Sequence, residues 1–332
     1  MNSLPPKNEI WYTTSDGCIV TPYENAKFGA NIISNTYENG KGVIKFDAPI
    51  TLIGAMSFSK CSTLVNVTLP EGVTEIGCGV FMKCKSLTSI TIPGCVTIIR
   101  TGAFLGCSNL ADITIPDSVT EIQWSAFCGC TSLENITLPN SIKSIDSALF
   151  KKCSSLKEIT IPDSVEIIMG EAFEGCTGLA NVTLGKGVKD IWHNAFKGCT
   201  SLTSIFIPDS VYEIREEAFA ECVSLANVTL GKDITYLGDG VFKGCTSLTK
   251  ITIPRSVCCI PSEAFAKCTN LKDVYMEDEG KYPAYEYGAF AENAPDFKIH
   301  VPKGCADSYE WWSGWRNYRD KGIIVEYEPE NK

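Results

Sequence analysis

The stretch Cys199-Thr-Ser-Leu-Thr-Ser-Ile-Phe-Ile-Pro-Asp-Ser-Val211 decides the fold, because its pattern recurs along most of the chain at one interval of 23 residues. A cysteine marks the interval in ten successive copies, with phenylalanine three residues before it and leucine three residues after it: Cys61, Cys84, Cys107, Cys130, Cys153, Cys176, Cys199, Cys222, Cys245 and Cys268. The shared pattern is A-F-x-x-C-x-x-L-x-x-I-x-I-P-x-S-V-x-x-I. Self-similarity at a fixed period of this length predicts a solenoid.

One copy of the pattern predicts one coil with a strand and a turn of helix. In Ser204–Ile207 polar and apolar residues alternate, which predicts a short strand with its aliphatic side chains pointing inward. Pro208 ends this strand because proline has no backbone N–H to donate. The chain then crosses the far side, where apolar residues at helical spacing predict one helical turn: Val211, Ile214, Ala218, Phe219 and Cys222. One coil cannot close its own core, so neighbouring coils must stack on it.

The pattern continues past the ten strict copies. Ile44 and Phe46 occupy the strand positions of an earlier copy, with Ile50 and Ile53 following in register. The strand pattern returns in residues 299–302, after an insertion of two residues between Glu277 and Tyr287. Residues 42–302 therefore predict an α/β, right-handed solenoid. It would have one curved parallel sheet of about 12 short strands, spaced by roughly 4.8 Å, and short helical turns on the other side.

Residues 1–41 predict a hairpin cap ahead of the repeats. Glu9–Thr14 and Cys18–Thr21 flank the turn Asp16-Gly17, and Glu38-Asn39-Gly40 predicts a second turn. Because the first coil of a solenoid has an open core face, we expect these strands to cover it.

Residues 303–332 predict a cap made of a helix and a strand. Residues 306–318 fit an amphipathic helix, and the strand Ile323–Tyr327 follows it. The predicted helix contains four large aromatic residues: Tyr309, Trp311, Trp312 and Trp315. These aromatic residues could form a binding surface. A plug over the last coil is the favoured interpretation, because an open solenoid end must be covered by bulky apolar groups.

The pattern resembles the BspA-like leucine-rich-repeat family. L-x-x-I-x-I is the first half of a leucine-rich repeat, and serine stands where the common form has asparagine, at Ser118, Ser141, Ser164, Ser210 and Ser256. Proline follows the strand directly, A-F-x-x-C precedes it, and the segment from Cys199 to Val211 is similar to the family consensus. Residues 299–309 also resemble the family's ending. The resemblance implies a non-enzymatic bacterial protein of the cell surface, or a secreted one, often involved in adhesion.

The cysteine column has four possible interpretations: disulfides, metal ligands, nucleophiles or packing. Residues in register on stacked strands have Cβ atoms about 4.8 Å apart, whereas a disulfide needs about 3.8 Å. We therefore predict that Cys61 to Cys268 are buried, reduced thiols that pack as small apolar groups. The other seven cysteines form no C-x-x-C pair with histidine partners, which argues against zinc: Cys18, Cys78, Cys95, Cys128, Cys258, Cys259 and Cys305. So many unpaired cysteines favour a reducing or anaerobic setting.

Charge and histidine content narrow the function classes. With 29 Lys and Arg against 39 Asp and Glu, the net charge is −10, which disfavours binding to nucleic acid or to an anionic membrane surface. No apolar run approaches the roughly 18 residues of a membrane-spanning helix. His193 and His300 are the two histidines, and His193 lies beside Trp192 on the variable back segment, where a solvated residue is expected. We therefore expect neither an enzyme nor a cofactor.

The outward positions of the predicted sheet carry the remaining signal. Between the two inward aliphatic residues of each strand the column is mostly threonine, which strand propensity explains. Phe206, Tyr275 and His300 interrupt this column, and Lys250 and Asp273 lie two residues earlier on neighbouring strands. Exposed aromatic side chains flanked by mixed charges are typical of an interface centre, while drift of the end repeats would produce the same interruption. We predict these five residues as the partner-binding site.

The sequence thus favours a non-enzymatic binding or adhesion module that presents its sheet to a protein or glycan partner. The alternative is a structural spacer in a surface or fibre assembly, with no ligand on the sheet. Residues 1–10 lack the apolar region of a signal peptide. We therefore expect a cytoplasmic protein if Met1 is the native start, and a surface or secreted protein if an export signal has been removed.

Overall fold

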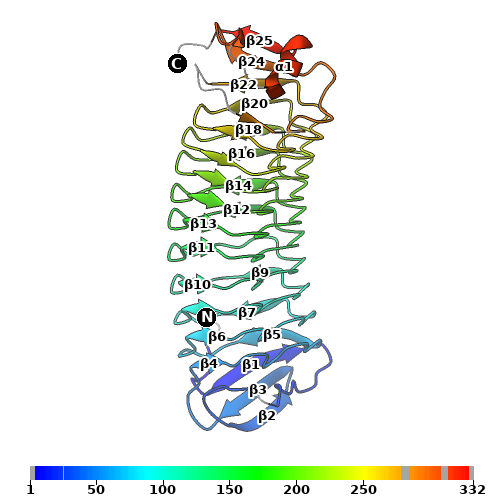
Figure 1. The fold of residues 1–332 in the computed structure, drawn as a ribbon. Coiled ribbons are helices and arrows are strands. Elements are labelled where there is room, and N and C mark those ends of the chain that lie inside the picture. The colour runs from blue at the N-terminus through cyan, green and yellow to red at the C-terminus, as the bar shows by residue number, and fades with distance from the viewer. Residues whose placement is uncertain (1–3, 25, 278–283, 287, 308–312, 329–332) are drawn as a thin grey trace. The chain divides into compact units, whose positions relative to one another are not determined.

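The computed structural model describes the chain apart from residues 1–3, 25, 278–283, 287, 308–312 and 329–332 (Figure 1). These described residues form a parallel-strand β-solenoid of about eleven turns with almost no helix. It divides into two compact units: unit 1 comprises residues 1–165 and 175–178, and unit 2 comprises residues 166–174 and 179–332.

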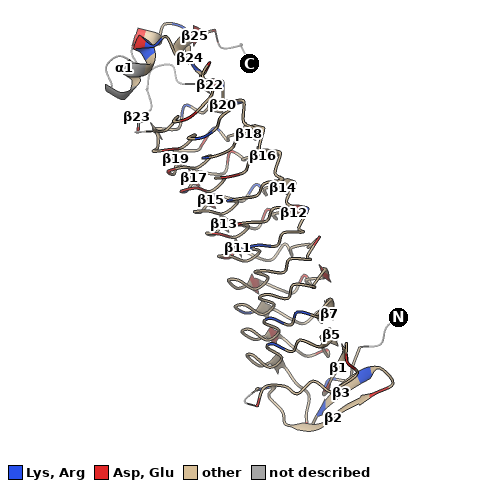
Figure 2. Cartoon of the chain, turned by 90° about the vertical axis from the view of Figure 1, so that its right-hand side faces the viewer, with Lys and Arg blue, Asp and Glu red and all other residues tan. Residues whose placement is uncertain are grey.

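Within each unit a coil carries one strand from L-x-x-I-x-I and a second from V-x-x-I, and the two strands lie on different sides of the coil (Figure 2). We name these sides the LxxIxI face and the VxxI face. In unit 1 the LxxIxI strands are β5 (Leu64–Thr68), β7 (Ser89–Thr91), β9 (Asp112–Ile113) and β12 (Glu158–Thr160). Its VxxI strands are β4 (Leu52–Ile53), β6 (Glu75–Ile76), β8 (Ile98–Ile99), β10 (Glu121–Ile122) and β11 (Ser144–Ile145).

Unit 2 repeats this arrangement. Its LxxIxI strands are β14 (Asn181–Thr183), β16 (Ser204–Phe206), β18 (Asn227–Thr229), β20 (Lys250–Ile253), β22 (Asp273–Met276) and β24 (Lys298–Pro302). Its VxxI strands are β13 (Ile167–Ile168), β15 (Asp190–Ile191), β17 (Glu213–Ile214), β19 (Tyr236–Leu237), β21 (Cys259–Ile260) and β23 (Ala284–Tyr285).

Three N-terminal strands extend the LxxIxI face of unit 1: β1 (Glu9–Thr14), β2 (Ile32–Glu38) and β3 (Lys41–Phe46). The sheet order is β2-β3-β1-β5-β7-β9, and β1 is antiparallel to both β3 and β5. The predicted hairpin between Glu9–Thr14 and Cys18–Thr21 is therefore wrong, because β3 and β5 occupy both edges of β1. The predicted turn at Asn39 and Gly40 is present and joins β2 to β3, with φ angles of 50° and 78°.

The predicted first repeat is half present. Ile44 and Phe46 are buried as expected, but they lie in β3, which β1 separates from the parallel strands. Ile50 and Ile53 are also buried, and β4 pairs in parallel with β6 as the register predicted. The strand that closes the LxxIxI side of this coil is therefore supplied by an N-terminal segment that precedes the repeats.

A stack of phenylalanine rings runs through the core of each unit. Centroids of successive rings are 5.3–5.6 Å apart in unit 1 and 5.0–5.6 Å apart in unit 2, and the ring planes are within 14° of parallel. The stack rings from Phe58 to Phe265 are at most 1% exposed, and Phe290, the last ring, is 5% exposed. Such rings make offset-stacked contacts whose geometry needs an identical side chain in each neighbouring coil. This need for the same side chain in every coil explains why phenylalanine recurs at a fixed interval of 23 residues.

The A-F-x-x-C segment forms a column of tight turns, so the predicted helical turns, and the α/β class with them, are wrong. In this segment some backbone N–H groups donate to a carbonyl of the next coil, and others donate to the carbonyl three residues earlier in the same coil. Thus Phe58 N donates to Val80 O at 2.9 Å, and Cys61 N donates to Phe58 O at 3.1 Å. Lys60 and Met56, one and five residues before Cys61, have positive φ angles of 63° and 61°. Left-handed residues end an α-helix, and the ladder to the next coil takes donors that a helix would use.

The ladder on the LxxIxI face is interrupted, so the predicted single sheet of about 12 strands is also wrong. In unit 1 the hydrogen-bonded sheet ends at β9, and residues 134–138 form no strand. In unit 2, β16 pairs with β18, while β20, β22 and β24 belong to a separate sheet. Within each of these sheets the strands keep their register. At the interruptions, neighbouring coils are joined by hydrogen bonds between their turns.

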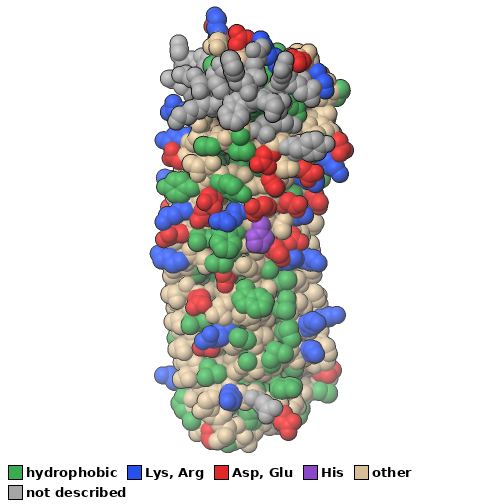
Figure 3. Space-filling model, in the orientation of Figure 1, with side chains coloured by type: hydrophobic (Ala, Val, Ile, Leu, Met, Phe, Trp, Pro, Cys, Tyr) green, Lys and Arg blue, Asp and Glu red, His purple; other side chains and the backbone are tan. Residues whose placement is uncertain are grey.

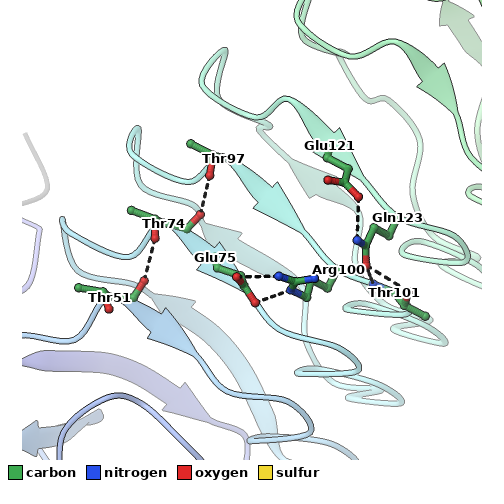
Figure 4. A network of polar contacts seen from close by, with 8 residues as sticks. All are labelled: Thr51, Thr74, Glu75, Thr97, Arg100, Thr101, Glu121 and Gln123. Atoms are coloured by element: carbon green, nitrogen blue, oxygen red, sulfur yellow. Dashed lines mark hydrogen bonds and ion pairs between the residues drawn. The ribbon is translucent and has the colours of Figure 1, made fainter.

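Four of the five VxxI strands of unit 1 form the sheet β10-β8-β6-β4, and threonine side chains continue its ladder (Figure 4). The Thr74 hydroxyl donates to Thr51 O and the Thr97 hydroxyl donates to Thr74 O, both at 3.2 Å. Beside them, Arg100 and Glu75 form an ion pair in which a second guanidinium nitrogen donates to the carboxylate at 3.0 Å. On this face, side-chain hydrogen bonds and an ion pair thus join neighbouring coils.

Unit 2 ends in α1 (Ser313–Asp320) and β25 (Ile324–Tyr327), which adds in parallel to β24. Within the described residues α1 overlaps the predicted helix over residues 306–318 and ends two residues beyond it; Tyr309, Trp311 and Trp312 lie outside the described residues. Trp315 is fully buried, with its ring 6.5 Å from Phe290. It packs against the end of the phenylalanine stack and is not a surface residue. Among the described helices, none is long and apolar enough to cross a membrane.

Candidate functional site

The five predicted site residues all lie on the LxxIxI face of unit 2. Phe206 is on β16, Lys250 on β20, Asp273 and Tyr275 on β22, and His300 on β24. Strand register places Lys250 opposite Asp273 and Tyr275 opposite His300. The 23-residue period, lengthened before β24, gives Phe206, Tyr275 and His300 one outward position of their strands, and it gives Lys250 and Asp273 the position two residues earlier.

Tyr275, His300 and Asp273 form a compact group. The tyrosine and imidazole rings stack with centroids 4.4 Å apart and planes 13° from parallel. His300 Nε2 lies 2.6 Å from Asp273 Oδ1, so the carboxylate fixes one edge of the imidazole. The side chain of His300 is 19% exposed and that of Asp273 is 40% exposed. The group therefore presents a pre-ordered surface with little side-chain freedom left to lose.

Tyr327 on β25 completes this arrangement, and the sequence analysis did not identify it. Its ring meets Tyr275 edge-on at 5.5 Å and His300 at 6.5 Å, and its hydroxyl donates to Met276 O at 3.2 Å. Burial raises the pKa of Tyr327, and nearby Glu277 adds to the effect. The alternating apolar and polar residues of Ile324–Tyr327 predicted a strand. They did not show which strand it would pair with, because the repeat period does not extend to β25. We call Asp273, Tyr275, His300 and Tyr327 the Tyr275 group.

Phe206 lies apart from the Tyr275 group. Its ring is 63% exposed, and the outward positions of the next two strands, Thr229 and Thr252, separate it from Tyr275. Three strand spacings correspond to roughly 14 Å. The predicted residues thus divide into one solitary exposed ring and one packed group.

A hollow of about 600 Å³ lies between these two features. Its floor includes Thr229 and Thr252, and Tyr275 bounds it; the complete lining is Ala226, Asn227, Val228, Thr229, Lys250, Ile251, Thr252 and Tyr275. Lys250 has no carboxylate partner within the described part of the chain. Hydroxyl, amide and ammonium groups beside an aromatic ring suit the binding of a polar partner with an apolar contact.

The cysteine column is structural. None of the ten members forms a disulfide, and nine are buried, as the spacing predicted; Cys61, in the first strict copy, is only half-buried, so the prediction is wrong for this member. From Cys84 onward each thiol donates to the phenylalanine carbonyl 26 residues earlier, at 2.9–3.3 Å. That carbonyl also accepts the N–H of the cysteine in its own coil, so the thiol occupies its second lone pair. Burial raises the pKa of Cys107 to about 12, and a thiol held protonated in this way is a poor nucleophile and metal ligand.

The remaining candidates are dispersed. His193 is exposed and follows β15. Over the described ranges, no three His, Cys, Asp or Glu residues are arranged to hold a metal ion. Outside the LxxIxI face, large exposed aromatic side chains include Trp124, Tyr212 and Tyr236, which are 57%, 50% and 44% exposed. Figure 3 shows apolar side chains in several separate patches of the visible face, interspersed with charged ones.

The repeat matches the family model for the BspA type leucine rich repeat region, in six copies over residues 30–157, 143–272 and 189–303. The chain belongs to the BspA-type leucine-rich repeat family. This leucine-rich repeat fold is typically non-enzymatic. No curated protein matches the chain.

Several solved structures are similar to this BspA-type chain. A leucine-rich repeat protein from Eubacterium ventriosum is 22% identical, with a TM-score of 0.54 over 82% of this chain and 78% of that one. A leucine-rich repeat protein from Bacteroides ovatus is 24% identical, with a TM-score of 0.43 over 99% and 100% of the two chains. A leucine rich cell surface protein from Faecalibacterium prausnitzii is 23% identical, with a TM-score of 0.48 over 100% and 97%. The likeness to the Eubacterium protein supports the fold alone.

Proposed function

We propose that this chain is a binding or adhesion module that captures a protein partner on the LxxIxI face of unit 2. The observation that carries the proposal is the 63% exposed ring of Phe206 in a column of threonines. An aromatic ring that reaches the centre of an interface contributes about 2 kcal/mol or more to binding, whereas an exposed ring contributes little to folding. Membership of the BspA-type family supports a binding role.

The Tyr275 group supplies the second anchor. Its rings are stacked and its histidine is held by Asp273, so a partner that packs on it has little side-chain entropy to remove. The two anchors and the floor between them span five strands, or roughly 20 Å, which is the width of an ordinary protein contact patch. Lys250 and Asp273 give this patch both signs of charge, as expected around an interface core.

A glycan is the second candidate partner, and the hollow between the anchors is the observation that favours it. Thr229, Thr252 and Asn227 offer hydroxyl and amide groups beside the ring of Tyr275. Sugars combine hydroxyl groups with apolar ring faces, so they would use both kinds of contact. A structural spacer, by contrast, has no use for either an exposed ring or a polar hollow at this position.

The test uses the full chain immobilised on a sensor surface, with a panel of purified extracellular-matrix proteins and a glycan array as probes. Phe206→Ala combined with Tyr275→Ala should weaken protein binding by about 100-fold, or roughly 2.7 kcal/mol. The matched control is Tyr212→Ala with Tyr236→Ala, which removes two exposed rings from the VxxI face and should leave binding unchanged. A second control, Thr114→Ala with Thr137→Ala, alters the LxxIxI face of unit 1 outside any residue assigned to a binding site.

The outcomes separate the candidate functions. Loss of binding in the Tyr212 and Tyr236 variant alone would move recognition to the VxxI face. Binding that appears on the glycan array and not with proteins, and that Phe206→Ala with Tyr275→Ala weakens, would favour the second candidate. A chain that binds no probe on either panel would favour the spacer.

A further inference from the structure

A pocket of about 390 Å³ lies on the LxxIxI face of unit 1, where β1 runs beside β5. It is lined by Leu4, Trp11, Tyr12, Thr13, Lys41, Asn66, Thr68 and Thr91. Its volume falls within the range of about 300–1,000 Å³ that is usual for small-ligand sites. None of the five residues predicted as the binding site contributes to it.

Strand register gives this pocket a wall and a floor. Trp11 on β1 lies opposite Thr68 on β5, and Thr68 lies opposite Thr91 on β7. A large indole therefore stands beside two small side chains on the same face of the sheet. Trp11 Nε1 donates to Glu9 Oε2 at 2.9 Å, which fixes the orientation of the ring. The result is an apolar wall next to a hydroxylated floor.

Lys41 adds a positive charge to the wall. Its Nζ lies 3.0 Å from the centroid of the Trp11 ring, a cation–π contact. In the part of the chain that the structure describes, this ammonium group has no carboxylate partner. The carboxylate of Glu9 accepts the indole N–H of Trp11 and forms no ion pair with Lys41, so this lysine is available for the anionic group of a ligand.

The floor carries hydrogen-bonding groups that the protein does not use. No hydrogen bond involves the hydroxyl of Thr68 or that of Thr91 within the described residues. Asn66 is fixed beside them, because its amide donates to Thr13 Oγ1 at 3.0 Å and its carbonyl accepts from Ser89 Oγ at 2.5 Å. Two free hydroxyls on a rigid floor favour a ligand with several hydroxyl groups of its own.

We propose that this pocket binds a uronic-acid residue of an acidic glycan. The apolar face of the sugar ring would pack on Trp11, its hydroxyls would bond to Thr68 and Thr91, and its carboxylate would meet Lys41. A neutral sugar leaves the ammonium group without a partner, and an acidic peptide side chain lacks both the ring and the hydroxyls. This site lies in unit 1 and does not depend on the protein partner proposed for unit 2.

The test compares trimers of galacturonic acid and of glucuronic acid with their methyl esters, by calorimetry on the full chain. The free acid of at least one trimer should bind, and its ester should bind at least 10-fold more weakly. Lys41→Met should weaken binding of the acid by at least 10-fold and leave binding of the ester unchanged. Lys45→Met is the matched control, because Lys45 lies on the same strand and face but does not line the pocket.

Thr68→Val with Thr91→Val should weaken the acid and the ester alike, since it removes the hydroxyl contacts without removing charge. Thermal unfolding of each variant checks that the fold is intact. The proposal is overturned if neither trimer binds as the free acid, if acid and ester bind equally, or if Lys41→Met and Lys45→Met weaken binding of the acid by the same factor.

Discussion

Raising the pH should unfold this protein cooperatively within about one unit above pH 9. Burial raises the pKa of four column thiols to about 12, against an ordinary value of 9.0: Cys107, Cys176, Cys222 and Cys268. The folded state keeps these protons at a pH where the unfolded chain releases them. The stability that the thiols contribute is therefore complete below about pH 9 and is lost as the pH rises toward 12, because the unfolded state then binds fewer protons.

The size of the effect follows from these values. At about pH 10, a thiol with an unfolded pKa of 9.0 and a folded pKa of about 12 removes roughly 1.4 kcal/mol from the free energy of unfolding. Four such thiols remove about 6 kcal/mol, which is comparable with the whole stability of an ordinary domain, about 5–15 kcal/mol. Burial raises the pKa of further column thiols and adds to the effect in the same direction: Cys84, Cys130, Cys153 and Cys245.

The assay is urea unfolding at a series of pH values, with the ultraviolet absorbance of the thiolate recorded in parallel. The thiolate signal of the column cysteines and the loss of structure should appear in one transition. Cys222→Ala should reduce the fall in unfolding free energy between about pH 9 and pH 10 by about 1 kcal/mol, and Cys78→Ala, at an exposed thiol, should not change it. A thiolate signal near pH 9 from more than the seven cysteines outside the column, in a protein that is still folded, would refute the reasoning, because the column would then be open to solvent.

Two further predictions concern single coils. The Cys153 thiol donates to Phe127 O at 3.2 Å, so Cys153→Ala should lower the free energy of unfolding by about 2 kcal/mol, while Cys153→Ser keeps a donor and should lower it by about 1 kcal/mol. A larger loss with serine, measured by urea unfolding, would mean that the bond to the carbonyl contributes nothing. Ala148 has a φ angle of 52°, so Ala148→Gly should raise the free energy of unfolding by about 0.5 kcal/mol, since relief of strain outweighs the freedom that glycine gains in the unfolded chain. The buried Ala126 has no such φ angle, and a gain of the same size from Ala126→Gly would contradict this account.

The inward positions could be predicted from sequence because each is set by stacking on copies of itself. Phe104 stacks on Phe81 at 5.4 Å and on Phe127 at 5.3 Å, and this contact requires the same side chain at a constant interval. The burial of the cysteines follows from the same interval. Their carbonyl partners could not be predicted, because they depend on the backbone register between coils.

The turn conformation could not be predicted from spacing alone. Ala218, Phe219 and Cys222 point inward both in a helical turn and in a column of tight turns, so their spacing does not separate the two structures. The available signal was glycine immediately before the cysteine in five of the ten copies: Gly106, Gly129, Gly175, Gly198 and Gly244. These positions all have positive φ angles, which glycine adopts without strain.

The site was only partly predictable for a related reason. The outward column and its interruptions follow from the repeat, which placed the five candidate residues on one face. Two strand pairings join the repeats to segments outside the 23-residue period. Trp11 pairs with Thr68, and His300 pairs with Val325, which brings Tyr327 to the Tyr275 group. Pairings of this kind are set by tertiary contacts that no local pattern records.

Phe206 is the outward residue that the fold explains least. The contacts that hold its coil to the next one point inward, such as the stack of Phe196 on Phe219 at 5.2 Å and the bond from the Cys222 thiol to Phe196 O. Thr229, its register partner on β18, shows that threonine suits the same position of the coil. A large ring placed there is 63% exposed, so it gains little from packing and exposes apolar surface, which favours unwanted association. Binding of a partner offsets that cost and a passive spacer does not, so Phe206 argues for recognition even though the scaffold around it would fold equally well without the ring.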